Sequence, residues 1–351
     1  MAKKIILKFT PNDYYFFGKE NTGKKGGDNY FLKSNAVPPP STILGAVRYW
    51  MLLVSNLLVN GNILDKNEAS KTIGADSFQL NGDFKMSKLE SVSNLFLLDK
   101  ENNKYLPAPL CLDTADSLQF EFKTFPTIKK YNPKTELITQ YTNGTTTLKE
   151  EDIFKSVIDN HNRKNNRIAN DEDAFFKTEF YYLKNNFSFG VEIEVADDFN
   201  PSNTTPITMK MGGENKLFKV EILNKKDLAS NDTILKNYAN GTHYKLVFTS
   251  DAYLENLQKT DYLFGILHTK TFRSIIANIN NLNNYNALDK TANDKAQLHK
   301  SKMVQLIKAG SVLYFDTEDS ANTFISKYIE NENNKKAGFN QITLLQPNKN
   351  N

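Results

Sequence analysis

The stretch Pro38-Pro39-Pro40-Ser41-Thr42-Ile43-Leu44-Gly45-Ala46-Val47-Arg48 passes abruptly from extended chain into helix. The prolines hold the incoming chain extended, because proline disfavours helical conformation in the residue before it. Ser41 or Thr42 is expected to cap the helix by accepting a hydrogen bond from a backbone N–H group. A helix start also carries unpaired N–H groups and the positive end of the dipole, which together suit a phosphate.

Gly45 and Arg48 follow at a spacing that places them on one face of this helix. Glycine lets another backbone come close, and arginine binds a phosphate or a base edge through its planar guanidinium fork. The stretch therefore predicts a phosphate site made by Ser41, Thr42, Gly45 and Arg48. A capped core helix with one solvated arginine explains the same residues, so both interpretations stay open.

The patterns outside this stretch predict a mixed fold. Lys4–Thr10 alternates apolar and polar residues as a half-buried strand does. Thr42–Val59 has the length and apolar content of a helix, and Asn60-Gly61 closes it. The second half again runs strand, helix, strand between Leu217 and Leu345. The sequence therefore predicts an α+β protein with two domains of related design.

A polar, proline-containing stretch at 197–206 sets the expected domain boundary. Residues 1–200 would form the N-terminal domain and residues 201–351 the C-terminal domain. The region from about 127 to 167 is rich in Thr, Asn and Lys and has little apolar periodicity. We expect it to be a long loop or a partly ordered insertion in the first domain.

The composition is that of a globular protein. Of 351 residues, 39% are hydrophobic and 24% charged, which allows a buried core, and 12% are aromatic, which favours mixed or β-rich structure. A single cysteine, Cys111, excludes a disulfide framework and a cysteine-rich zinc site. The N-terminus lacks the apolar core of a signal peptide, and polar residues interrupt the apolar segment Ile43–Val59. We therefore expect no membrane segment and a cytoplasmic location.

The basic residues are unevenly divided between lysine and arginine. The net charge is only +4, yet 44 residues are basic, and the only arginines are Arg48, Arg163, Arg167 and Arg273. Where lysine is the default basic residue, each arginine is expected to be placed for its geometry. This favours a planar partner such as RNA. Further candidates for phosphate contacts are Lys24, Lys25, Lys335 and Lys336.

A second glycine motif, Gly212-Gly213-Glu214, precedes an expected strand. Paired glycines would let an RNA backbone pass close to the chain, which makes Gly212 and Gly213 candidate contacts. A plain turn explains the motif equally well.

Motifs for catalysis are scarce. The chain has no phosphate-binding loop, no G-x-G-x-x-G after a strand and no H-E-x-x-H, and its four histidines are not at metal-ligand spacing. No cofactor and no metal are expected. His161 lies close to Arg163 and Arg167, so a metal-free ribonuclease site is one hypothesis, with histidine moving the 2′-hydroxyl proton. Because no second acid–base group is positioned, a basic loop that contacts RNA or solvent is the alternative.

Several short motifs follow one another along the chain in a characteristic order. They are Pro11-Asn12-Asp13 with Phe16-Phe17-Gly18, Pro38–Arg48, Tyr105-Leu106-Pro107-Ala108-Pro109, Arg167-Ile168, Phe176–Phe180, Gly212-Gly213-Glu214, Ala309-Gly310-Ser311 and Gly338-Phe339. Taken together, this ordered set resembles the family of the third subunit of the type III-B CRISPR effector, the Cmr complex, in the RAMP superfamily.

This resemblance implies two tandem ferredoxin-like (RRM-like) domains and a non-catalytic, RNA-binding subunit in antiviral defence. The subunit would hold the 5′ repeat-derived tag of the guide RNA (crRNA) and dock the large polymerase-like subunit to the first backbone subunit. Target RNA would be reached indirectly, through the guide. Three alternatives stay open: a guide-processing endoribonuclease of the same superfamily, a scaffold without RNA contact, and the equivalent subunit of a type III-A effector.

Overall fold

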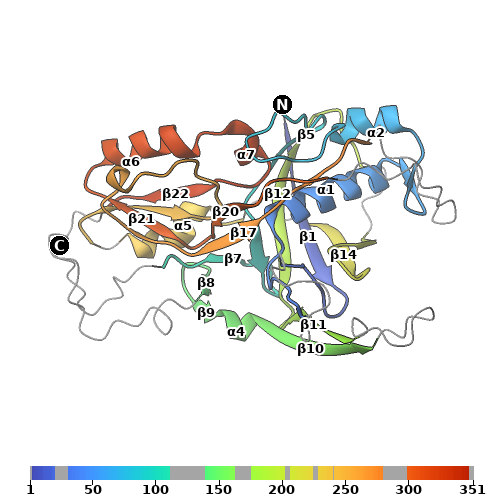
Figure 1. The fold of residues 1–351 in the computed structure, drawn as a ribbon, viewed down its shortest axis with the longest axis horizontal. Helices are drawn as coiled ribbons and strands as arrows, with labels where there is room; N and C mark the ends of the chain where they lie inside the picture. Colours follow the sequence, from blue (N-terminus) through green and yellow to red (C-terminus); the bar gives the residue numbers. More distant parts are fainter. Residues whose placement is uncertain are drawn as a thin grey trace.

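The computed structural model describes residues 2–19, 31–110, 139–162, 175–201, 206–223, 228–239, 241–279 and 299–347. It confirms a mixed α/β protein whose sheets are mostly antiparallel (Figure 1). Two sheets dominate this part of the chain, one of nine strands and one of four.

The larger sheet is built around β1 (Lys3–Pro11), which the alternating pattern predicted. β1 pairs antiparallel with β12 (Ser188–Val195) and with β14 (Leu217–Leu223). The sheet continues on both sides with β13 (Ile207–Lys210), β5 (Leu89–Val92), β6 (Phe96–Leu98), β7 (Lys104–Pro107), β8 (Gln140–Thr142) and β9 (Thr147–Lys149).

One face of this sheet is covered by apolar side chains, and part of the other face also lies in a buried core. Leu7 and Phe9 of β1 lie in the largest buried cluster, together with Val47 and Trp50 of the helix α1 (Pro40–Val54). Ile6, on the opposite face of the same strand, lies in a second buried cluster. Since successive side chains of a strand point to opposite faces, β1 connects two cores.

The first helix starts differently from the expectation. Its N-cap residue is Pro39, with no side-chain cap, so Ser41 and Thr42 lie inside the first turn. The prediction that one of them caps the helix is therefore wrong. The amides of Thr42 and Ile43 both donate to the Pro39 carbonyl, at 2.9 and 3.2 Å. Because Pro40 has no N–H group, few donors remain at this helix start.

The first helix also ends earlier than expected, at Val54. The chain then forms a short hairpin of β3 (Leu58–Val59) and β4 (Asn62–Ile63), in which Asn60 and Gly61 have positive φ. Asn-Gly with positive φ at both positions is typical of a two-residue hairpin turn. α2 (Lys66–Ile73) follows, capped by Asp65.

The smaller sheet has the order β16 (Phe264–Ile266), β21 (Val312–Phe315), β15 (Tyr244–Phe248), β22 (Ile342–Leu345), all antiparallel. α6 (Glu318–Phe324), continued by the π-helix Ile325–Ile329, covers one face. The short α5 (Asn231–Leu235) packs between the other face and the larger sheet, in the second buried cluster.

The sheets divide the chain differently from the expected boundary at 200. β13 and β14 lie after that boundary, yet they belong to the larger sheet through the pairing of β14 with β1. A segment near the C-terminus also returns to the first core: α7 (Glu332–Lys336) contacts β5, and Phe339 is completely buried there.

Part of the expected insertion at 127–167 is regular structure. The described residues 139–162 form β8, β9, the single turn α4 (Glu150–Ile153) and β10 (Phe154–Asn162). β10 pairs along its whole length with β11 (Phe175–Leu183) in a three-stranded sheet that also contains β2 (Phe31–Leu32). Residues 139–162 therefore fit the partly ordered alternative rather than the loop, because a strand pair with exposed faces needs no apolar periodicity.

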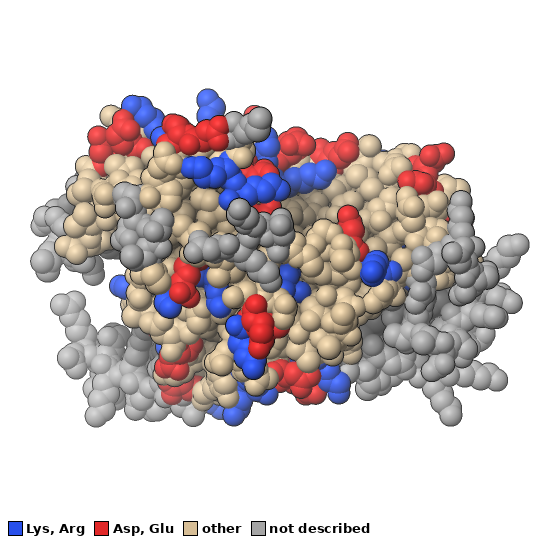
Figure 2. All heavy atoms as spheres, turned by 180° about the vertical axis from the view of Figure 1, so that it is seen from behind, with Lys and Arg blue, Asp and Glu red and all other residues tan. Residues whose placement is uncertain are grey.

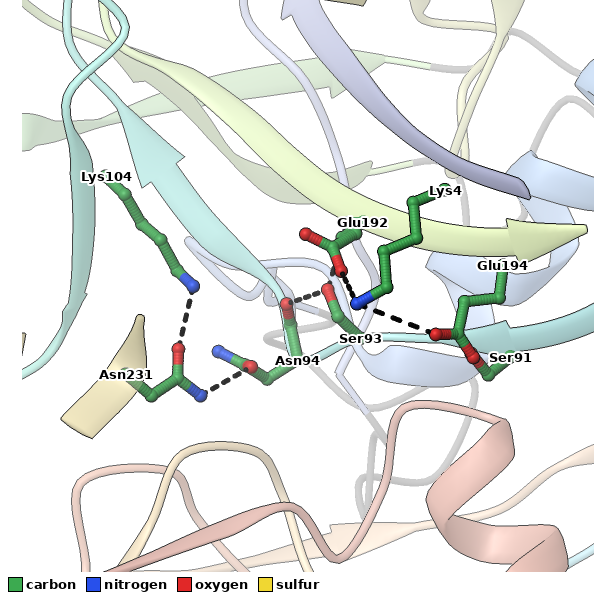
Figure 3. Close-up of polar contacts among 8 residues, drawn as sticks. All are labelled: Lys4, Ser91, Ser93, Asn94, Lys104, Glu192, Glu194 and Asn231. Atoms are coloured by element: carbon green, nitrogen blue, oxygen red, sulfur yellow. Dashed lines mark hydrogen bonds and ion pairs between the residues drawn. The ribbon is translucent and has the colours of Figure 1, made fainter. Parts of the chain in front are cut away.

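A polar network connects the larger sheet to α5 (Figure 3). Lys104 Nζ donates to Asn231 Oδ1 at 2.7 Å, and Asn231 Nδ2 donates to the buried Asn94 at 3.0 Å. The Lys104 ammonium also lies 4.9 Å from the centre of the Phe96 ring. Beside this joint, Lys4 lies on the sheet near two carboxylates, those of Glu192 and Glu194.

Burial lowers the pKa of Lys104 from 10.5 to about 8, although the Glu192 charge opposes the shift. Above pH 8 the folded protein holds fewer protons here than the unfolded chain, so stability should rise with pH. Between pH 7 and 10, the free energy of unfolding of the wild type should rise by at most about 3 kcal/mol relative to that of Lys104→Met. Urea unfolding of both proteins across this range tests the prediction, and parallel pH profiles would contradict it.

Candidate nucleic-acid interface

An open cleft of about 750 Å³ lies along the first half of α1. α1 contributes Ser41, Thr42, Gly45 and Arg48 to its wall, so the structure brings the four residues of the opening motif to one site. Gly18, Lys19 and Asn35 lie at one side of the cleft.

A two-stranded ribbon from the second half of the chain forms the opposite wall. It consists of β17 (Thr269–Phe272) paired with β20 (Val304–Ile307), and of β18 (Ile275–Ile276) paired with β19 (His299–Lys300). Figure 1 shows the ribbon running from the smaller sheet across α1 toward α2. The cleft therefore lies between segments that are more than 200 residues apart in the sequence.

The far end of the ribbon is fixed to the loop after α2. Ser77 N donates to the Ala277 carbonyl and Ile279 N to the Ala75 carbonyl, both at 2.8 Å. Asn278 Nδ2 also donates to Asp76 Oδ1 at 2.7 Å. These bonds, here called the ribbon dock, hold the two walls of the cleft together.

The cleft is strongly basic. The described lining residues include no aspartate or glutamate. They include six cationic side chains: Lys19, Arg48, Lys270, Arg273, Lys300 and Lys308. One of them, Lys270, forms an ion pair with Asp251 behind the wall. A described lining with several cations and no carboxylate is suited to a polyanion.

Arg48 is held inside the wall rather than extended into the cleft. It is 9% exposed, Nη1 donates to the Asp76 carbonyl at 2.8 Å, and Nη2 donates to the Lys85 carbonyl at 3.3 Å. The guanidinium lies 5.5 Å from the Phe84 ring, and burial lowers its pKa to about 10, although nearby Asp76 raises it. Nε alone has no partner among the described residues. Arg48 therefore supports the ribbon dock through Asp76.

Gly45 is exposed to the cleft, and a Cβ atom built on it would meet no described atom within 4 Å. Ser41 and Thr42 are half-buried on the same wall. Neither hydroxyl has a hydrogen-bond partner within the described part of the chain.

Gly212 and Gly213 lie near the cleft without lining it. A Cβ on Gly212, whose φ is +77°, would lie 2.4 Å from the Phe16 carbonyl oxygen, and Gly213 N donates to that oxygen at 2.9 Å. The glycines thus fix the backbone at Phe16, two and three residues before Gly18 and Lys19 of the cleft.

Lys335 and Lys336 lie on α7, at a separate surface. Lys336 forms a 3.8 Å ion pair with Glu332 and lines a hollow that also contains Glu90 and Glu194. The neighbouring Phe339 stacks on Phe78 at 4.8 Å and is fully buried, so its ring is not available to a nucleobase.

Four other candidates, Lys24, Lys25, Arg163 and Arg167, lie outside the described residues. His161 is on β10 with its backbone opposite Phe176, and its side chain is likewise outside the description.

Sequence reasoning missed most of the cleft's cations. Lys19, Lys270, Arg273, Lys300 and Lys308 come from a loop and from a ribbon whose short strands carry no clear apolar pattern. Arg273, one of only four arginines, was the signal that could have indicated this wall.

The face seen in Figure 2 carries charges of both signs. On the face in Figure 2, basic and acidic side chains are interspersed without a large area of one sign. Among the described residues, no group of three or more His, Cys, Asp or Glu is placed to hold a metal ion. No helix of the described chain is long and apolar enough to cross a membrane.

Comparison with protein families identifies the class of protein. The family model described as CRISPR-associated protein (Cas_Cmr3) matches residues 7–127 and 121–347. The chain belongs to this family, which confirms the resemblance to the third subunit of the type III-B Cmr effector drawn from the ordered motifs. A comparison with curated proteins finds no similar sequence.

Two solved structures share the fold. One is described as the type III-B Cmr-beta complex bound to cognate target RNA and AMPPnP in state 1, the other as the same complex bound to cognate target RNA. The matching chains are 16% and 15% identical, with TM-scores of 0.50 and 0.51. Each alignment covers 97% of this chain and 96% of the other.

Proposed function

We propose that this chain is a non-catalytic, RNA-binding subunit of a type III-B CRISPR effector. Its basic cleft would hold the 5′ repeat-derived tag of the guide RNA. The observation that carries this proposal is the cleft itself. Six cationic side chains and no described carboxylate line it, although Arg48 is held in the wall and Lys270 is paired with Asp251. A single-stranded tag would bind through lysine–phosphate contacts, with affinity that falls as salt rises.

The strand orders support the finer fold assignment. In the larger sheet, the order β14-β1-β12-β6 places the fourth, first, third and second strands of one unit side by side. The smaller sheet repeats this order as β22-β15-β21-β16. We infer two tandem variants of the ferredoxin-like fold, each with a helix in only one of its two crossover connections within the described chain.

Fixing the tag would set the register in which the guide pairs with target RNA. The same subunit would dock the large polymerase-like subunit to the first backbone subunit. The described cleft lining contains no histidine and no carboxylate to act as a general base, which favours binding over cleavage.

Binding of tag RNA to the full chain at several salt concentrations tests this proposal. The triple variant Lys19→Gln, Arg273→Gln, Lys308→Gln should bind about tenfold or more weakly. Its salt slope should fall by about one for each phosphate that is no longer neutralised. Lys100→Gln is the matched control, because this exposed lysine pairs with Glu101 away from the cleft. Equal affinities and slopes in all three proteins would refute the assignment of the cleft. Cleavage of repeat RNA by the purified chain would instead support the endoribonuclease alternative.

A further inference from the structure

Among the described residues, nothing packs against Gly45 that would require it to be glycine. It lies in the interior of a 15-residue helix, where glycine is less favourable than alanine, and its φ is not in the left-handed region. A Cβ there would meet no described atom within 4 Å, so no described neighbour requires its absence. The missing side chain leaves room on the α1 wall of the cleft for a ligand.

The hydroxyls of Ser41 and Thr42 border this space. They lie four and three residues before Gly45, so all three residues share one face of the helix. A serine or threonine hydroxyl can both donate and accept a hydrogen bond, and these two are without partners among the described residues. The α1 wall therefore offers two neutral hydroxyls, each able to donate and to accept a hydrogen bond, beside the open space at Gly45.

The α1 wall is poorly suited to phosphate. Pro40 lacks an N–H group, and the Thr42 amide donates to the Pro39 carbonyl. Arg48, the only cation that α1 (Pro40–Val54) contributes to the cleft, directs both Nη atoms at backbone carbonyls. The ribbon wall, in contrast, carries Lys270, Arg273, Lys300 and Lys308. Phosphates are thus favoured on the ribbon side and neutral groups on the α1 side.

We propose that the α1 wall reads the ribose: Gly45 admits a sugar against the helix, and Ser41 and Thr42 bond its 2′-hydroxyl. This inference rests on the proposed binding of single-stranded RNA in the cleft. The 2′-hydroxyl both donates and accepts, and it is the group by which a protein distinguishes RNA from DNA. Gly45, Ser41 and Thr42 would therefore set the preference for RNA, while the ribbon cations would supply most of the affinity.

The test compares the affinity of the full chain for tag RNA and for the same oligonucleotide in all-deoxy form. The wild type should favour RNA by about tenfold, as expected for one or two hydrogen bonds. Ser41→Ala with Thr42→Val should bring the ratio close to one and leave DNA binding unchanged. Gly45→Ala should also lower the ratio, while raising the melting temperature by about 1–3 °C.

The controls separate this inference from the function on which it rests. Lys308→Gln should weaken RNA and DNA binding by the same factor. If it does so but the variants on α1 keep the wild-type ratio, or lower both affinities equally, ribose reading is refuted and the cleft assignment stands. If Lys308→Gln and the triple cation variant change neither affinity, the proposed function itself fails.

Discussion

Phe339→Ala is expected to lower the free energy of unfolding by about 3–5 kcal/mol, the range for truncating a buried aromatic ring. The ring stacks on Phe78 at 4.8 Å and meets Phe272 edge-on at 5.5 Å. Phe78 follows α2, Phe272 belongs to β17, and both line the cleft. The substitution would therefore remove the side chain that joins the ribbon to the first core beneath the basic cleft.

Urea unfolding of the full chain measures this effect. Phe339→Leu keeps part of the volume and should cost clearly less, which provides a folded variant if the alanine variant does not fold. Leu263→Ala is the control, since that side chain is 42% exposed and should change stability by less than about 0.5 kcal/mol. If Phe339→Ala lowers the free energy of unfolding no more than Leu263→Ala does, the packing described for the ribbon is contradicted.

Arg48→Ala should destabilise the free protein by about 2–4 kcal/mol, before any RNA is added. The substitution removes the charged group that donates hydrogen bonds to the backbone carbonyls of Asp76 and Lys85. It also leaves a cavity beside Phe84. Relief from burying a charge offsets part of this loss, because burial lowers the pKa of Arg48 to about 10.

The local effect should appear at the ribbon dock. Amide hydrogen exchange at Ser77 and Ile279 should speed up in Arg48→Ala, because Ser77 and Ala75, the acceptor for the Ile279 amide, lie on either side of Asp76. Arg48→Lys should behave similarly, since a lysine ammonium cannot span both carbonyls as a guanidinium does. Unchanged stability and exchange, together with weaker RNA binding, would instead show that Arg48 acts on RNA directly.

The opening stretch was informative because its signal is local. Prolines followed by a periodic apolar segment predict a helix wherever the chain folds, and α1 begins at Pro40. The exposure of Gly45 and the burial of Arg48 depend instead on what packs against the helix. Arg48 meets Asp76 and Lys85, and no rule of spacing indicates those contacts.

The errors of sequence interpretation share a physical cause. The ribbon was not predicted because β17 to β20 are short and half-exposed, and their pairing partners lie about 30 residues apart. The boundary expected at 200 followed composition, whereas β14, which lies after it, pairs with β1 in the larger sheet. Long-range pairing is specified by the whole sheet rather than by any one strand.

The burial of Phe339 in the first core also bears on how the chain is made. A ribosome synthesises β1 and α1 early, and N-terminal domains commonly fold while synthesis continues. Here the core around Phe9 and Trp50 lacks one of its rings until residue 339 has been added. At ordinary elongation rates that interval is on the order of tens of seconds. The nascent chain would carry an incomplete apolar core for this time, during which a chaperone has surface to bind.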